Sequence, residues 1–185
     1  DFSRLRIGTR LALVFGLVIT VFLVMAAVAR VRIGALNAEI GDIVGRRYAT
    51  TVLANQLKGE VGDASRGMMS VLIMADEGQV KKELARIEEL MKAHDATLAA
   101  FTQRADDEAS QTQLKEVGAL RDKFVPAQAA FVKMVAEGNK EEAQLKYLFS
   151  VRAVQTRYLA ALDKFVATQH AAMEAAGAAS AVQAE

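Results

Sequence analysis

The feature that most constrains the fold is a regular spacing of apolar and small residues along residues 33–75. These residues recur in alternating steps of three and four, at Ile33, Leu36, Ile40, Ile43, Arg47, Thr50, Ala54, Leu57, Val61, Ala64, Met68, Val71 and Ala75. Only Arg47 is charged, and no proline interrupts the run. A repeat of this kind keeps one stripe of a helix against its neighbours. We therefore predict one long helix that forms a wall of a helical bundle.

The composition supports an all-α fold and excludes several classes of function. Helix-forming residues dominate, with one proline and no tryptophan in 185 residues. The formal net charge of +1 predicts no strong positive electrostatic field that would attract a polyanion, so nucleic acid is not an expected partner. Cysteine is absent, which excludes disulfides, thiolate metal sites and thiol catalysis.

An apolar segment precedes the long helix. Residues 11–29 form an uncharged segment that is long enough to span a bilayer as a helix. Three arginines precede the segment and two follow it, namely Arg4, Arg6 and Arg10, then Arg30 and Arg32. Because cytoplasmic flanks carry the excess of positive charge, we predict a cytoplasmic tail over residues 1–10. A transmembrane helix over residues 11–30 and a periplasmic part from residue 31 onward follow from this orientation.

A cleaved signal peptide is the alternative interpretation of this segment. Residues 27–29 (AVA) have the small-x-small pattern of a cleavage site. Signal peptides, however, usually have apolar regions of about 7–15 residues, shorter than this one. The helical spacing also continues through the proposed cleavage point. We therefore favour an uncleaved membrane anchor.

Breaks in the spacing divide the rest of the chain into three more helices. Residues 76–78 (DEG) predict a tight turn, and residues 104–108 end the second helix and begin the third. Pro126 lies inside the third helix, where it is expected to produce a kink. Gly138 suits a left-handed helix end, and Asn139 with Glu142 predicts a capping box for the fourth helix.

Short loops make neighbouring helices antiparallel. We therefore predict an all-α protein in which an N-terminal transmembrane helix is continuous with an antiparallel up-down-up-down four-helix bundle over residues 31–175. Four small residues on the first helix, Gly34, Ala38, Gly41 and Gly45, share one face. Such a face allows close approach of another helix, and a second copy of the chain is the natural candidate.

Several stretches of this chain occur in the order found in a known family. After the anchor and the long first helix come residues 121–127 (RDKFVPA), residues 138–143 (GNKEEA) and residues 158–163 (YLAALD), followed by Gln169. In this order they resemble the four-helix-bundle sensor domain of bacterial methyl-accepting chemotaxis receptors. The resemblance covers nearly the whole chain.

The resemblance implies an inner-membrane receptor that forms a homodimer through its first helix. It also implies that residues 176–185 lead into a second membrane span, beyond which a cytoplasmic relay would control a kinase through an adaptor. Similar bundles also serve as input domains of membrane histidine kinases and nucleotide cyclases. A structural, membrane-tethered bundle without a ligand is a further alternative.

Binding is a better expectation than catalysis for this chain. The sequence has no glycine-rich phosphate loop and no pair of histidines at ligand spacing. His94 lies on the seam of the second helix, that is, on the stripe that faces the neighbouring helices. We expect it to be a packed, hydrogen-bonded core residue. We predict no enzymatic activity, no cofactor and no metal site.

Receptors of the resembled family bind small molecules near the end of the bundle away from the membrane, mainly between the first and fourth helices. Counting from the helix ends places Arg66 level with residues 150–152. Two arginines on facing helices, Arg66 and Arg152, would suit a di- or tricarboxylate. Further candidate contacts are Tyr147, Gln155, Thr156 and Tyr158 for hydrogen bonds and Met69 for an apolar wall. Taken singly, each arginine could equally lie on a solvated helix face. Arg66, for example, follows Asp63 by three residues and could pair with it on the helix surface.

Overall fold

The structure is a computed structural model that describes residues 7–105 and 107–184. The described residues are almost entirely helical and include no strand. The all-α prediction is confirmed. The chain forms two compact units, residues 1–42 and residues 43–185.

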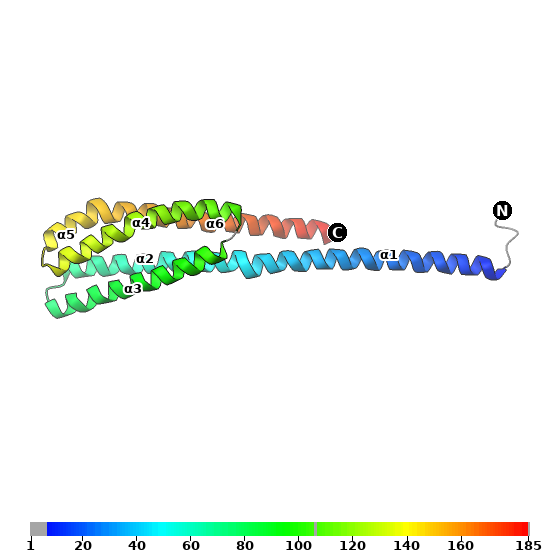
Figure 1. The fold of residues 1–185 in the computed structure, drawn as a ribbon, viewed down its shortest axis with the longest axis horizontal. Helices are drawn as coiled ribbons and strands as arrows, with labels where there is room; N and C mark the ends of the chain where they lie inside the picture. Colours follow the sequence, from blue (N-terminus) through cyan, green and yellow to red (C-terminus); the bar gives the residue numbers. More distant parts are fainter. Residues whose placement is uncertain (1–6, 106, 185) are drawn as a thin grey trace. The chain divides into compact units, whose positions relative to one another are not determined.

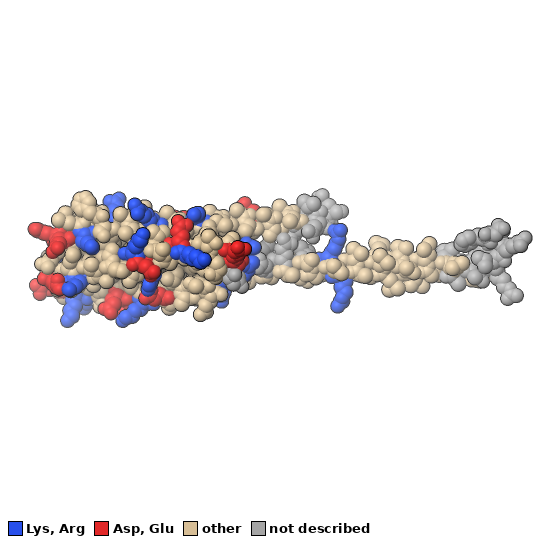
Figure 2. Space-filling view, turned by 45° about the horizontal axis from the view of Figure 1, so that its top comes forward, with Lys and Arg blue, Asp and Glu red and all other residues tan. Residues whose placement is uncertain are grey.

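The first unit contains α1 (Ile7–Asp42). Within it, Phe15–Ala35 is a candidate membrane span of 21 residues with mean hydropathy 2.1, and none of it is buried. This segment overlaps the predicted span over residues 11–30 and extends past Arg30 and Arg32. Figure 2 shows the described surface of α1 as almost wholly uncharged. Of the predicted cytoplasmic tail, residues 1–6 lie outside the described residues.

The second unit is a bundle of antiparallel helices (Figure 1). Its elements are η2 (Ile43–Tyr48), α2 (Ala49–Ile73), α3 (Glu77–Arg104), α4 (Glu108–Ala136), α5 (Lys140–Lys146), η3 (Tyr147–Val151) and α6 (Arg152–Ala184). Helix α2 packs on α3 and α6, and α4 packs on α6, whereas α3 and α4 contact each other little. The surface of the bundle carries both signs of charge, interspersed (Figure 2).

The predicted seam forms the core from Thr50 to Val71, whereas Ala75, the last residue of the series, is exposed beyond the end of α2. Its apolar members Leu57, Val61, Met68 and Val71 are completely buried. Phe101, Phe124, Phe131 and Phe165 fill the centre from the other helices. Helix α3 approaches α2 closely at Gly67, where an added Cβ would lie 2.8 Å from Ile87 Cγ1. In the first unit, by contrast, Ile33 and Ile40 are exposed. The side chains of Leu36 in that unit and of Ile43 in the second unit lie outside the described residues.

Acidic caps begin two of the helices. Asp76 accepts a hydrogen bond from the Gln79 backbone N–H at 2.7 Å, and Asp107 accepts one from the Ser110 N–H at 2.9 Å. Arg46 also donates to Asp107 at 2.8 Å. Each carboxylate thus satisfies a backbone donor that lacks a partner within its helix.

The loop over residues 137–139 agrees with the prediction at one residue and differs at the next. Gly138 has φ +85°, the predicted left-handed conformation. Asn139, however, makes no side-chain cap hydrogen bond to α5, so the predicted capping box is wrong. Its backbone N–H instead donates to the Met134 carbonyl oxygen at 2.9 Å, which closes the end of α4.

The predicted fourth helix contains a π-helical turn, η3, that the sequence analysis did not foresee. Ala143, Tyr147 and Val151 are all buried, so the seam takes two consecutive steps of four here. A strict heptad would alternate four with three. The π turn accommodates the additional residue and keeps the core positions inward on both sides.

Candidate functional site

A buried hydrogen bond joins α2 to η3 near the tip, the end of the bundle formed by the loops over residues 74–76 and 137–139. Ser65 Oγ and Tyr147 OH lie 2.7 Å apart. The predicted neighbourhood of first and fourth helices therefore exists, but Ser65 lies level with Tyr147 rather than with residues 150–152. The difference arises because α2 ends at Ile73, earlier than the predicted turn, and residues 74–76 are not helical.

The other predicted contact residues divide between the surface and the core. Arg66, Met69, Arg152 and Thr156 are exposed. The Arg66 side chain is 69% exposed and forms an ion pair with Asp63. Gln155 is half-buried, and its Oε1 is buried without a hydrogen-bond partner in the described structure. Tyr147 and Tyr158 lie in the core.

An exposed stripe runs along the outer face of α2 at the same alternating spacing as the core seam. We call it the α2 stripe; its members are Tyr48, Val52, Asn55, Gly59, Gly62, Arg66, Met69 and Ile73. Four of these are large apolar or aromatic residues, and Ile73 is 87% exposed. In the sequence, the same spacing continues back through Gly45, Gly41, Ala38 and Gly34. Arg66, the predicted ligand contact, is thus part of this stripe.

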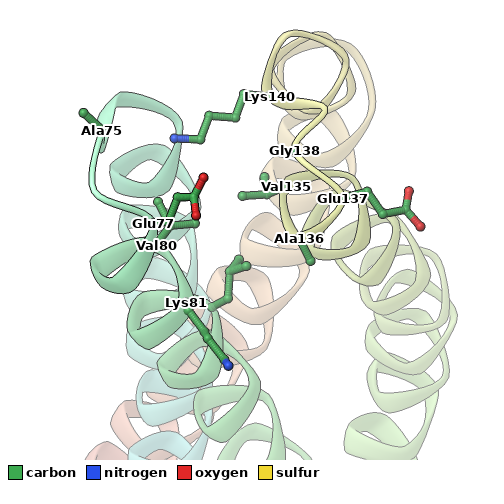
Figure 3. Close-up of a pocket in the computed structure, with 10 residues that line it drawn as sticks. Ala75, Glu77, Val80, Lys81, Val135, Ala136, Glu137, Gly138 and Lys140 are labelled. Atoms are coloured by element: carbon green, nitrogen blue, oxygen red, sulfur yellow. The ribbon is translucent and has the colours of Figure 1, made fainter.

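Cavities in the described bundle lie mainly beside α3 and α4. A tip pocket of about 670 Å³ is lined by charges of both signs, which come from Glu77 and Lys81 on α3 and Lys140 on α5. Figure 3 shows Lys140 reaching across this pocket, where its ammonium donates to the Met74 carbonyl oxygen, while Glu137 points away. Four pockets can be described in the bundle, and none of the seven predicted contact residues lines one of them. Among all the residues that the structure describes, no cluster of His, Asp and Glu could hold a metal ion.

The sequence matches the family model described as a four helix bundle sensory module for signal transduction, over residues 4–184. The chain belongs to this family. The resemblance inferred from the order of the helix motifs is thereby confirmed. A comparison with curated proteins finds no match.

Membership makes the chain a sensory module of signal transduction rather than a member of an enzyme family. The apolar helix α1 is consistent with a membrane location for such a module.

A buried polar cluster lies in the middle of the sensory module. His94 on α3 and Tyr158 on α6 are completely buried, and His94 Nε2 lies 3.0 Å from Tyr158 OH. His94 Nδ1 lies 3.4 Å from Glu60 Oε2, and neither atom has a hydrogen-bond partner among the described residues. The other Glu60 oxygen accepts from Thr97 at 2.8 Å. The predicted packed histidine is confirmed, whereas its pairing with Tyr158 was not predicted.

Burial controls the ionisation of both ring groups in this cluster. Desolvation lowers the pKa of His94 below its ordinary value, and the negative charges of Glu60 and Asp95 only partly oppose it. The positive charge of Arg121 on α4 also lowers the pKa of His94. Desolvation likewise raises the pKa of Tyr158 well above its ordinary value. Both groups are therefore neutral near pH 7, and their hydrogen bond joins two uncharged partners.

Acidification from about pH 7.5 to 5 is expected to lower the free energy of unfolding. His94 in the unfolded chain binds a proton near its ordinary pKa of about 6.5. The folded chain, with the lower pKa, resists protonation in the window below that value. The unfolded state therefore binds more protons there, and stability falls as the pH falls. Urea unfolding at a series of pH values measures this loss.

The two histidines provide the control for this pH effect. His94→Gln should reduce the pH dependence, while His170→Gln, a change at an exposed position, should leave it intact. An unchanged slope in His94→Gln would mean that carboxylates alone produce the loss of stability.

Proposed function

We propose that this sensory module is the periplasmic ligand-binding part of a transmembrane chemoreceptor for a small organic acid, with a di- or tricarboxylate favoured. The observation that carries the proposal is the buried Ser65–Tyr147 hydrogen bond, which fixes α2 against η3. Arg66 follows Ser65 directly, and Arg152 follows η3 directly. Two exposed guanidinium groups beside one interhelical contact offer planar donors to carboxylates on both elements.

A second copy of the chain completes this site. A single protomer has no described pocket at Arg66, yet the α2 stripe exposes Tyr48, Val52, Met69 and Ile73 to solvent. Its heptad spacing matches what a parallel helix pair requires, and an added Cβ at Gly59 would meet nothing within 4 Å. Dimerisation through this stripe would cover its apolar residues and place Arg66 within the interface.

Signalling proceeds by a small displacement of α6. A ligand that bridges α2 and the start of α6 favours the helix offset to which it binds more tightly. Packed helices slide by about 1–2 Å in such transitions. The π turn η3 lies between α5 and α6, where a change in backbone hydrogen bonding would shift α6 along its axis without refolding the bundle.

The membrane orientation follows from the charge flanking the apolar segment. Arg4, Arg6 and Arg10 hold the N-terminal tail in the cytoplasm, and α1 anchors the module in the inner membrane. The signal then reaches a cytoplasmic kinase and its adaptor.

Loss of either arginine is expected to weaken binding of the acid by about tenfold to a hundredfold, because a charge-assisted hydrogen bond contributes about 1.5–3 kcal/mol. Isothermal titration calorimetry of the whole chain in detergent micelles with succinate, malate and citrate measures the effect in Arg66→Ala and Arg152→Ala. Arg86→Ala is the matched control, because Arg86 is also exposed and paired with an acid three residues earlier, but on α3.

The outcome separates the proposal from its alternatives. Equal binding by wild type, Arg66→Ala and Arg152→Ala would show that the acid binds elsewhere. Absence of binding by all three acids would favour the ligand-free structural bundle. A weakened Arg86→Ala together with an unchanged Arg66→Ala would move the site to α3.

A further inference from the structure

A second feature of the bundle, remote from the α2–η3 contact, is the orphaned amide of Gln128. This residue lies on α4 and is 2% exposed. Its Oε1 and Nε2 atoms are both buried, and neither has a hydrogen-bond partner in the part of the chain that the structure describes. An unpaired buried polar group costs about 1–3 kcal/mol, so an amide with two such atoms requires an explanation.

Another buried glutamine shows how this bundle normally treats the residue. Gln169 on α6 is 3% exposed, and its Nε2 donates to Ser110 Oγ at 2.8 Å. Gln128 occupies an equivalent inward position between Phe124 and Phe131, both completely buried. A leucine would fit there without unpaired polar atoms. The amide at residue 128 therefore serves something other than packing.

Gln128 is one of the residues that line a groove between α3 and α4. The groove has a volume of about 310 Å³. Its other lining residues are Ile87, Glu88, Met91, Val125, Ala129, Val132 and Lys133. The groove exists because α3 and α4 contact each other little, while each packs well on another helix. It combines an apolar wall with one polar group that lacks a partner, the usual composition of a small-molecule site.

The charges at the edge of the groove are already paired. Lys133 lies 3.8 Å from Glu137 on the same helix, and Glu88 lies 3.6 Å from Lys92. Neither edge offers an uncompensated charge to an ion. A neutral ligand therefore fits the groove better than the organic acid assigned to the α2–η3 site.

We propose that the groove between α3 and α4 binds a small, neutral, mainly apolar molecule that carries an amide group. An amide edge presents one donor and one acceptor side by side, which matches Gln128 Oε1 and Nε2 together once this buried amide turns toward the groove that its residue lines. A ketone or ether would satisfy only the donor of Gln128, and a hydrocarbon neither atom. The ring or alkyl body of the ligand packs on Met91 and Val132.

Benzamide is the probe for this site, and the side-chain NH₂ signal of Gln128 is the readout. In protein-observed NMR of the whole chain in detergent micelles, that signal is identified by its loss in Gln128→Leu. Benzamide should shift it in a saturable manner. N,N-dimethylbenzamide, which has an acceptor but no donor, should bind about tenfold more weakly, because one hydrogen bond to a buried group is lost.

Two variants and two controls test the location. Ala129→Leu fills the groove from its exposed wall and should abolish the benzamide shift while Gln128 remains. Gln128→Leu should raise the melting temperature of the ligand-free chain, because it removes the unpaired amide. Gln103→Leu, a change at an exposed glutamine on α3, should alter neither property, and Arg66→Ala should leave the benzamide titration unchanged.

Three results would overturn the inference. These are an unshifted Gln128 signal at saturating benzamide, equal affinities for benzamide and its dimethyl derivative, or an unaltered titration in Ala129→Leu. Because none of these results involves Arg66 or an organic acid, a failure here leaves the proposed acid site standing. The converse also holds.

Discussion

Replacing Phe101 by alanine is expected to lower the free energy of unfolding by about 3–5 kcal/mol, the usual cost of removing a large aromatic side chain from a core. Phe101 is completely buried near the end of α3. Its ring packs edge-on against Phe165 with the ring centroids 4.7 Å apart, and such pairs contribute beyond their buried area. Truncation would leave a cavity, because the surrounding side chains relax only partly into the space.

Urea unfolding of the whole chain in detergent micelles, followed by far-ultraviolet circular dichroism, measures this loss. Phe149→Ala is the matched control. Phe149 is 79% exposed on η3, and substitutions at such positions usually change stability by less than about 0.5 kcal/mol. Equal effects of the two variants would contradict the placement of Phe101 in the core.

Replacing Tyr158 by phenylalanine is expected to cost about 1–3 kcal/mol, although it removes only one oxygen atom. The hydroxyl is the hydrogen-bond partner of His94 Nε2 at 3.0 Å, and both side chains are completely buried. His94 Nδ1 already lacks a partner among the described residues. After the substitution, neither ring nitrogen of this buried histidine would be satisfied.

The three tyrosines of the chain form a graded series for this test. Tyr147→Phe should cost less than Tyr158→Phe, because the remaining Ser65 hydroxyl can turn to a carbonyl of its own helix. Tyr48→Phe should have almost no effect on folding, since its side chain is 60% exposed. The same unfolding experiment ranks all three. A cost for Tyr48→Phe as large as that for Tyr158→Phe would remove the buried pair as the explanation.

Much of the fold could be predicted because helical periodicity is a property of neighbouring residues. The spacing through Leu57, Val61 and Met68 identified the buried face of α2 without knowledge of its partners. Gly138 signalled the end of α4 for a similar reason, since a left-handed residue there favours glycine. The order of the helix motifs was sufficient to identify the family.

The candidate sites could be predicted only in part. The packing of the first predicted helix on the fourth was correct, but the predicted relative height of their residues was wrong by about one helical turn because α2 ends at Ile73. The two consecutive steps of four at Ala143, Tyr147 and Val151 were a visible signal for the π turn. No pattern in the sequence distinguished Gln128, which lacks a partner, from Gln169, which has one.

The sequence by itself thus determined the helices, the inward faces of the bundle, the N-terminal apolar helix and the sensory family. Only the tertiary structure decided which polar side chains pair across helices: Ser65 with Tyr147, His94 with Tyr158, and Gln128 with no hydrogen-bond partner among the described residues. The physical reason is that facing residues depend on the relative height of two helices. Each residue adds about 1.5 Å along the axis, so a small change at one loop replaces every partner along the contact.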